Sequence, residues 1–130
     1  MKPSSIHTAR WDEPKRPDDG ERILITRFRP RGLPKAGETW DIWMPHLGPS
    51  KELLAAFKGK SGKPPIPWSA YRSAYLTEMR QQRDVIDELA RKVAGGEAIS
   101  LLCASSCKDE RRCHRSLLRE LIEKRILALP

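Results

Sequence analysis

The sequence predicts an α/β protein: a single compact three-layer domain with a short, mainly parallel sheet flanked by helices. An apolar run at residues 99–103 opens into a polar loop, and an amphipathic pattern follows Cys113, which is the order strand, loop, helix. A second compact apolar run covers residues 21–26, and helical periodicity covers residues 68–93 between the two runs. Strands that alternate with helices favour parallel pairing, so we expect one domain over residues 1–130.

Length and composition agree with this prediction. The chain has 130 residues and is 38% hydrophobic, which suffices for one core, whereas two domains would each be too small. No apolar stretch approaches the roughly 18 to 20 residues that cross a bilayer, and the first residues lack the apolar core of a secretory signal. Three cysteines within residues 103–113 do not suggest a secreted disulfide framework. We therefore expect a soluble, cytoplasmic protein with reduced thiols and no membrane association.

The N-terminal third is expected to contain two strands. Residues 4–9 form a short first strand in which Ile6 is the only strong apolar member. Residues 10–20 contain two prolines and end in Asp-Gly, which is typical of a loop. The β-branched run at residues 21–26 predicts the second strand. Beyond it the prolines of residues 30–34 interrupt regular structure, and Gly32 permits a positive φ.

The middle of the chain is expected to be helical. Residues 41–50 form a proline-punctuated connector, and Ser50 is a plausible N-cap for a short helix that ends near Phe57. After a Gly- and Pro-rich loop, apolar residues recur at helical spacing over residues 68–93, as one long helix or two helices broken near Gln81. We expect this stripe to be core, and the following glycine pair to end the helix.

The charge indicates a phosphate-bearing partner. The chain carries 25 Lys and Arg against 17 Asp and Glu, a formal net charge of +8, which attracts phosphate groups over long range. Residues 22–35 contain five basic residues and no acidic one, and residues 108–125 contain seven basic and four acidic residues. Most basic residues of the first stretch follow the predicted strand at residues 21–26, and the second stretch follows the predicted strand at residues 99–103. A small phosphate-bearing molecule or a nucleic acid is the expected partner.

Three arginines follow the second predicted strand. Arg27, Arg29 and Arg31 point to one side if the backbone stays extended, and their charges then repel unless an anion or acidic side chains lie between them. If residues 21–26 and 99–103 are adjacent parallel strands, both following loops meet at one edge of the sheet. This predicts an Arg-rich pocket. The alternative is a set of surface salt bridges to Glu38, to Asp41 or to the Asp18-Asp19 pair.

The segment from Cys103 to Arg115 permits three kinds of site. In the first, loop and helix N–H groups bind a phosphate or carboxylate with the help of Arg115 and Arg112. In the second, Cys103 or Cys113 is a nucleophile and His114 a base or acid. The segment lacks the Cys-x5-Arg spacing of a phosphatase-type loop, which disfavours that activity.

The third possibility is zinc bound by the cysteines and His114. The ligand types suit zinc, but the segment has no Cys-x2-Cys pair, and adjacent Cys113 and His114 rarely point at one ion, so we assign no metal ligands. Cys103 is also compatible with a plain buried strand residue. Dinucleotide, P-loop, zincin and hydrolase motifs are absent from the sequence, so none of these classical sites is supported, and the cofactor is unknown.

Taken in order, these motifs resemble the domain of unknown function 488 (DUF488) family of bacteria and archaea. The resemblance covers nearly the whole chain and lies in the segments 10–14, 22–32, 43–50, 71–79, 101–103 and 113–115. In that family the second motif reads Asp-Arg-Leu-Trp-Pro-Arg-Gly, so Thr26 and Arg29 depart from it, and Cys107 looks like an addition. The resemblance implies a small α/β domain with a polar cleft, and the family as a whole has no assigned function.

The resulting hypothesis is a binding site for a phosphate-bearing ligand, either a nucleotide or a nucleic-acid end, beyond the carboxyl ends of the strands. The candidate ligand-binding residues are Arg10, from the family-like opening, and Arg27, Arg29, Arg31, Gly32 and Arg115. The candidate chemical groups are Cys103, Cys113 and His114. The alternatives are a thiol-dependent enzyme with a Cys/His pair and a basic nucleic-acid interaction protein without catalysis. Whether the protein is an enzyme stays open at this point.

Overall fold

A four-stranded parallel sheet forms the centre of the protein. The computed structural model describes residues 5–60 and 62–129, so Ser4, the start of the predicted first strand, lies outside the described residues. The strands are β1 (Ile6–Arg10), β2 (Glu21–Leu24), β3 (Ile42–Trp43) and β4 (Ile99–Cys103). Their order is β1-β4-β2-β3 and all neighbours are parallel, which places β4 between β1 and β2.

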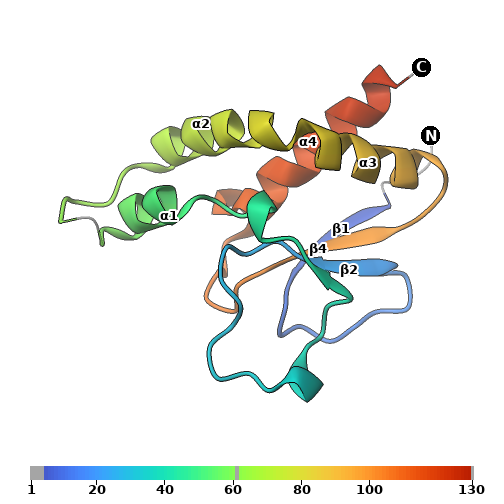
Figure 1. Cartoon of the computed structure of the whole chain (residues 1–130), viewed down its shortest axis with the longest axis horizontal. Coiled ribbons are helices and arrows are strands. Elements are labelled where there is room, and N and C mark those ends of the chain that lie inside the picture. The colour runs from blue at the N-terminus through green and yellow to red at the C-terminus, as the bar shows by residue number, and fades with distance from the viewer. Residues whose placement is uncertain (1–4, 61, 130) are drawn as a thin grey trace.

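Four α-helices pack together on one face of the sheet (Figure 1). They are α1 (Lys51–Lys58), α2 (Trp68–Met79), α3 (Arg83–Ala94) and α4 (His114–Ala128). Short 3-10 turns stand at η1 (Lys35–Gly37), η2 (Pro45–Leu47), η3 (Arg80–Gln82) and η4 (Glu110–Arg112). The predicted α/β class with a parallel sheet is confirmed, and the third layer consists of connecting segments in place of α-helices.

The alternation of side chains along the strands explains the two faces. Ile23 and Leu101 are opposite each other in the register and face the helices, where they join a large core with residues such as Tyr75 and Leu118. Leu24 and Leu102 face the other way, where Ala9 completes a small cluster against two half-buried tryptophans, Trp11 and Trp40. Burial on both faces accounts for the continuous apolar runs that predicted these strands.

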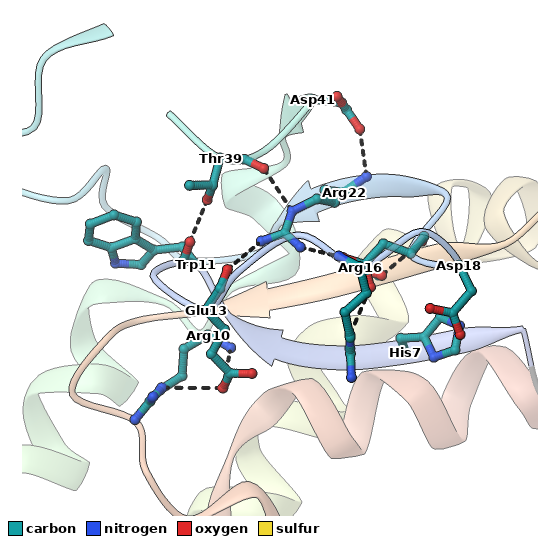
Figure 2. Close-up of polar contacts among 11 residues, drawn as sticks. His7, Arg10, Trp11, Glu13, Arg16, Asp18, Arg22, Thr39 and Asp41 are labelled. Atoms are coloured by element: carbon teal, nitrogen blue, oxygen red, sulfur yellow. Dashed lines mark hydrogen bonds and ion pairs between the residues drawn. The ribbon is translucent and has the colours of Figure 1, made fainter. Parts of the chain in front are cut away.

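A buried ion pair occupies the loop-covered face. The Arg22 guanidinium lies 2.5 Å from the carboxylate of Asp19, and both side chains are 1% exposed. The same guanidinium donates to the carbonyl oxygens of Thr39 at 2.7 Å and Glu13 at 3.3 Å (Figure 2). Ser100 of β4 donates from its hydroxyl to the Asp19 carbonyl. The pair therefore joins the β1–β2 loop to the segment before β3.

One element differs from the sequence prediction. Residues 42–43 form a strand inside the predicted connector, because the backbone N–H of Met44 and of Asp41 donates to β2 carbonyls, at Leu24 and Arg22. Residues 68–94 form two helices separated by η3, which is the second of the two predicted alternatives. The short helix after Ser50 is confirmed, with the Ser50 hydroxyl accepting from the N–H of Leu53. Within the described part of the chain, no helix is both long and apolar enough to cross a bilayer.

Candidate functional site

A cleft opens at the carboxyl edge of the sheet. Its volume is about 530 Å³, within the range of small-molecule sites. The segments after β2 and β4 and the start of α4 provide most of its lining, together with α1 and Tyr71 of α2. Because β2 and β4 are adjacent and parallel, the loops that follow them meet here, as the sequence predicted.

The cleft combines basic, aromatic and thiol side chains. Its basic members are Arg27, Arg31, Lys58, Lys108 and Arg112, and Asp109 is the one carboxylate in its described lining. Its aromatic members are Trp11, Phe28, Phe57 and Tyr71. Phe28 is 53% exposed, and the Nζ atom of Lys51 lies over its ring, 5.8 Å from the centroid. This composition suits an anion attached to an apolar or planar group.

The three arginines after β2 do not share one side. Arg27 lines the cleft while its guanidinium donates to the carbonyls of Pro49 and Gly48, at 2.9 and 3.2 Å. Arg29 turns away to Glu38 at 2.8 Å and lies 5.8 Å from the ring centre of Trp40. Among the described residues nothing forms an ion pair or hydrogen bond with the Arg31 guanidinium, which lines the cleft. The salt-bridge alternative therefore applies to Arg29 alone of the three.

Three other predicted ligand-binding residues lie outside the cleft lining. Arg10 contacts Asp12 at 3.5 Å and Glu13 at 3.3 Å. Gly32 has a φ of 70° in the loop after β2. Arg115 is 4% exposed, and its Nη2 donates weakly, at 3.5 Å, to the carbonyl of Cys107. Arg115 thus contacts the backbone of the cysteine loop, and no carboxylate of the described chain forms an ion pair with it.

Sulfur and imidazole groups form the floor of the cleft. The Sγ atoms of Cys103 and Cys113 are 3.2 Å apart, and the Nδ1 atom of His114 lies 3.9 Å from the first and 4.0 Å from the second. Cys103 ends β4, Cys113 precedes the first residue of α4, and His114 is that first residue. All three side chains are buried, and all three border the cleft. The structure therefore brings together all three predicted chemical groups.

A backbone contact fixes the orientation of the His114 ring. Its Nε2 atom lies 2.7 Å from the carbonyl oxygen of Ile25, which can only accept a hydrogen bond, so Nε2 carries a proton. In the neutral imidazole, Nδ1 then has a free lone pair, and it points toward the two thiols. The ring also packs on Tyr75, with centroids 5.5 Å apart. Both contacts hold the nitrogen lone pair in a defined direction.

Cys107 adds a third thiol to this group. Hydrogen bonds from Cys103 and Cys113 lower the pKa of Cys107 to about 3, and the positive charge of Arg115 adds to this effect. Donating to Cys107 raises the pKa of Cys103 to about 12, and hydrogen bonding to the other two sulfurs raises that of Cys113 as well. The pKa of the half-buried, cleft-lining Cys107 is therefore the lowest of the three thiols.

Comparison with known proteins identifies the family. Residues 6–126 match the family model DUF488-N3a, described as the active DUF488-N3 subclade. The chain belongs to the DUF488-N3a family. It is 31% identical to the uncharacterized protein YeaO of Escherichia coli over 116 residues, covering 89% of this chain and 95% of YeaO. It is 26% identical to the uncharacterized protein Mb3100c of Mycobacterium bovis over 125 residues, covering 96% of this chain and 99% of the relative. No solved structure matches the chain.

Sequence reasoning on this DUF488-N3a chain missed part of the cleft. Lys58 ends α1 and Phe28 follows β2, and neither carries a local signal of a site. Cys107 and Lys108 were visible as part of the cysteine segment, and Cys107 looked like an addition to it. The position of Cys107 beside the other two thiols depends on how the loop folds back, which no spacing rule reveals.

Proposed function

We propose that the cleft binds a phosphate-bearing small molecule of nucleotide size through its basic rim. The observation that carries the proposal is that the guanidinium groups of Arg31 and Arg112 line the cleft with no ion pair or hydrogen bond from the described residues. Two positive groups on one cleft favour an anion between them, because the one carboxylate of the described lining, Asp109, forms its ion pair with Arg111. The Arg27 guanidinium already donates hydrogen bonds to the carbonyls of Pro49 and Gly48. Arg27 therefore fixes the position of the segment after β2 on the same rim.

The aromatic side chains favour a nucleotide over free phosphate. Phe57 packs against Tyr71 with centroids 4.3 Å apart, and this pair forms part of the cleft wall. Exposed Phe28 lies on the wall formed by the segment after β2. A planar base gains from stacking on aromatic rings, whereas inorganic phosphate does not. The Cys/His group on the floor is where a reaction on the bound molecule would take place.

Calorimetric titration with nucleoside monophosphates and inorganic phosphate, at several salt concentrations, tests the proposal. We expect saturable nucleotide binding that is tighter than phosphate binding and weakens with salt. Arg31→Ala and Arg112→Ala should each weaken nucleotide binding by roughly tenfold or more, since charge-assisted hydrogen bonds contribute about 1.5–3 kcal/mol. Arg111→Ala is the matched control, because it removes a neighbouring charge whose side chain is 92% exposed and outside the cleft lining.

Two results would reject the proposal. One is the absence of saturable binding by any nucleotide tested. The other is equal nucleotide affinity in the wild type, Arg31→Ala and Arg112→Ala. Titration with a single-stranded oligonucleotide separates the proposal from the alternative of a nucleic-acid interaction protein: in that case only the oligonucleotide binds, and binding falls steeply with salt.

A further inference from the structure

We infer that Cys103, Cys113 and His114 bind a zinc ion on the floor of the cleft. Two sulfurs and one imidazole nitrogen lie within 4.8 Å of one another, and all three residues are buried. The sequence disfavoured zinc because adjacent Cys113 and His114 rarely point at one ion, yet here the Nδ1 atom of His114 is 4.0 Å from the Cys113 sulfur. The inference does not depend on nucleotide binding.

The distances suit a tetrahedral ion. Zinc–sulfur bonds of about 2.3 Å and zinc–nitrogen bonds of about 2.0–2.1 Å imply S–S and S–N separations of about 3.8 and 3.6 Å in a tetrahedron. The structure has 3.2 Å between the sulfurs, and 3.9 and 4.0 Å from sulfur to nitrogen. Movements of about half an ångström, within reach of small side-chain rotations, convert the observed triangle into three ligand positions.

The surroundings are those of a metal-binding histidine. A ligating imidazole commonly donates its second N–H to a carbonyl or carboxylate, which fixes the tautomer and directs the lone pair. His114 has this arrangement, because Nε2 contacts the Ile25 carbonyl at 2.7 Å and Nδ1 faces the sulfurs. The ligands also come from rigid places, namely the end of the central strand β4 and the start of α4.

Charge and access support the same inference. Two thiolates, a neutral imidazole and Zn²⁺ have a net charge of zero, so burying the complete set avoids the cost of burying isolated charges. All three ligands border the cleft, so the fourth position of the ion faces the open space of the cleft. Catalytic zinc sites have this form, with three protein ligands and one open position for water or substrate.

The test uses the full chain, reduced, freed of metal by chelation, and titrated with Co²⁺ and Zn²⁺ in the absence of nucleotide. We expect one equivalent of Co²⁺ to give a thiolate-to-cobalt charge-transfer band and the intense visible bands of tetrahedral coordination, and Zn²⁺ to abolish both by displacement. Because this readout uses the wild type, it does not depend on how any variant folds. Weak visible bands typical of octahedral cobalt, without charge transfer, would overturn the inference.

Variants then identify the ligands. Cys103→Ser, Cys113→Ser and His114→Asn should each weaken Zn²⁺ binding by more than about 100-fold, beyond the usual effect of changes around a ligand set. Cys107→Ser should keep one equivalent of metal, because the Cys107 thiol lies outside the group whose ligand atoms are all within 4.8 Å of one another. His46→Asn, which removes an exposed imidazole, is the control. Loss of metal in Cys107→Ser together with retention of metal in Cys103→Ser would contradict the assignment. Circular dichroism verifies that each variant is folded.

The result is separable from that of the nucleotide titrations. Loss of zinc binding in Cys103→Ser with unchanged nucleotide affinity supports both proposals. Nucleotide binding without the tetrahedral cobalt spectrum supports the proposed function and overturns the zinc site. The tetrahedral spectrum without nucleotide binding supports the zinc site and overturns the proposed function.

Discussion

Arg29 and Arg31 stand two positions apart, yet their guanidinium groups meet different surroundings. Arg29 contacts Glu38 at 2.8 Å, whereas Arg31 lines the cleft. Their spacing predicted one shared side, but the backbone bends at residues 27 and 28 and turns at residues 31 and 32, so it lacks the extended form on which that prediction depended. At the scale of single residues, the residue type gives the chemistry of a group, and the fold determines its partner.

Gly20 provides a prediction at the same scale. Its φ is 65°, and a Cβ atom built there would lie 2.0 Å from the carbonyl oxygen of Ala98, at the point where β2 begins beside β4. Gly20→Ala therefore combines left-handed strain, about 1–2 kcal/mol, with a collision against backbone. We expect a loss of stability clearly larger than that strain alone, measured by urea denaturation.

Gly32→Ala is the control for this prediction. Gly32 has a similar φ of 70°, and nothing lies within 4 Å of a Cβ atom there. Only the conformational strain applies to it. Equal losses of stability in Gly20→Ala and Gly32→Ala would show that the contact with Ala98 does not contribute to the free energy of unfolding.

At the scale of elements, one side-chain pair joins α1 to α2. The Ser50 hydroxyl accepts from the N–H of Leu53 at 3.1 Å as the N-cap of α1, and its own hydrogen bonds to Glu78 of α2 at 2.5 Å. The same carboxylate accepts from the Ser50 backbone N–H at 2.8 Å. The cap residue thus fixes both the start of α1 and the position of α1 against α2.

Ser50→Ala should lower the free energy of unfolding by about 1–2 kcal/mol, because it removes an N-cap and one hydrogen bond of Glu78. Urea denaturation measures the loss. Ser69→Ala, at an exposed position in the first turn of α2, is the control and should change stability by less than about 0.5 kcal/mol. In the double variant Ser50→Ala/Glu78→Gln the losses should not add, and additive losses would contradict the coupling.

The elements differ in how far the sequence reveals them. Strand β4 and helix α4 were predictable because apolar runs and helical spacing are local. Strand β3 was not, because its two residues are both exposed and are held in the sheet by hydrogen bonds to β2. The sequence does not decide between one helix and two here, since Met79 and Ile86 keep helical spacing across residues 80–82, where the backbone forms a 3-10 turn.

For the molecule as a whole, the meeting of the two loops was predictable and the contents of the cleft were only partly so. Adjacent parallel strands oblige the segments after β2 and β4 to share an edge. Two contacts depend on loop conformations, which amino-acid composition does not predict: the ion pair of Arg29 with Glu38 and the contact of Cys107 with the other thiols. Fold topology therefore predicts the place of the site better than its members.

The buried Asp19–Arg22 pair gives the molecule a pH dependence. Burial by itself raises the pKa of Asp19, but the N–H of Arg16, the guanidinium of Arg22 and Ser100 together hold that pKa below its ordinary value. A carboxyl whose pKa is lowered by folding stabilises the protein above its unfolded pKa of about 3.9, and this contribution is lost as the pH falls through the folded pKa.

Asp19→Asn should lower the free energy of unfolding at pH 7 by about 3–5 kcal/mol, because the buried charge of Arg22 then lacks a carboxylate to neutralise it. Denaturation between pH 7 and 2 should also show that the variant loses less stability than the wild type below about pH 4. Asp18→Asn is the control, because the Asp18 side chain is 73% exposed and, among the residues that the structure describes, forms an ion pair only with His7, at 3.6 Å. Identical pH profiles for the wild type and Asp19→Asn would contradict the role of this pair.

The nearness of the Cys103 and Cys113 sulfurs, 3.2 Å apart, means that residues 104–112 leave and return to nearly the same point. A loop with fixed, adjacent ends can grow or change composition at low entropic cost, since each doubling of its length adds only about 0.6 kcal/mol. Such a loop is a natural place for selectivity to diverge among related proteins: its sequence can be replaced while the sheet and the floor beneath it stay unchanged.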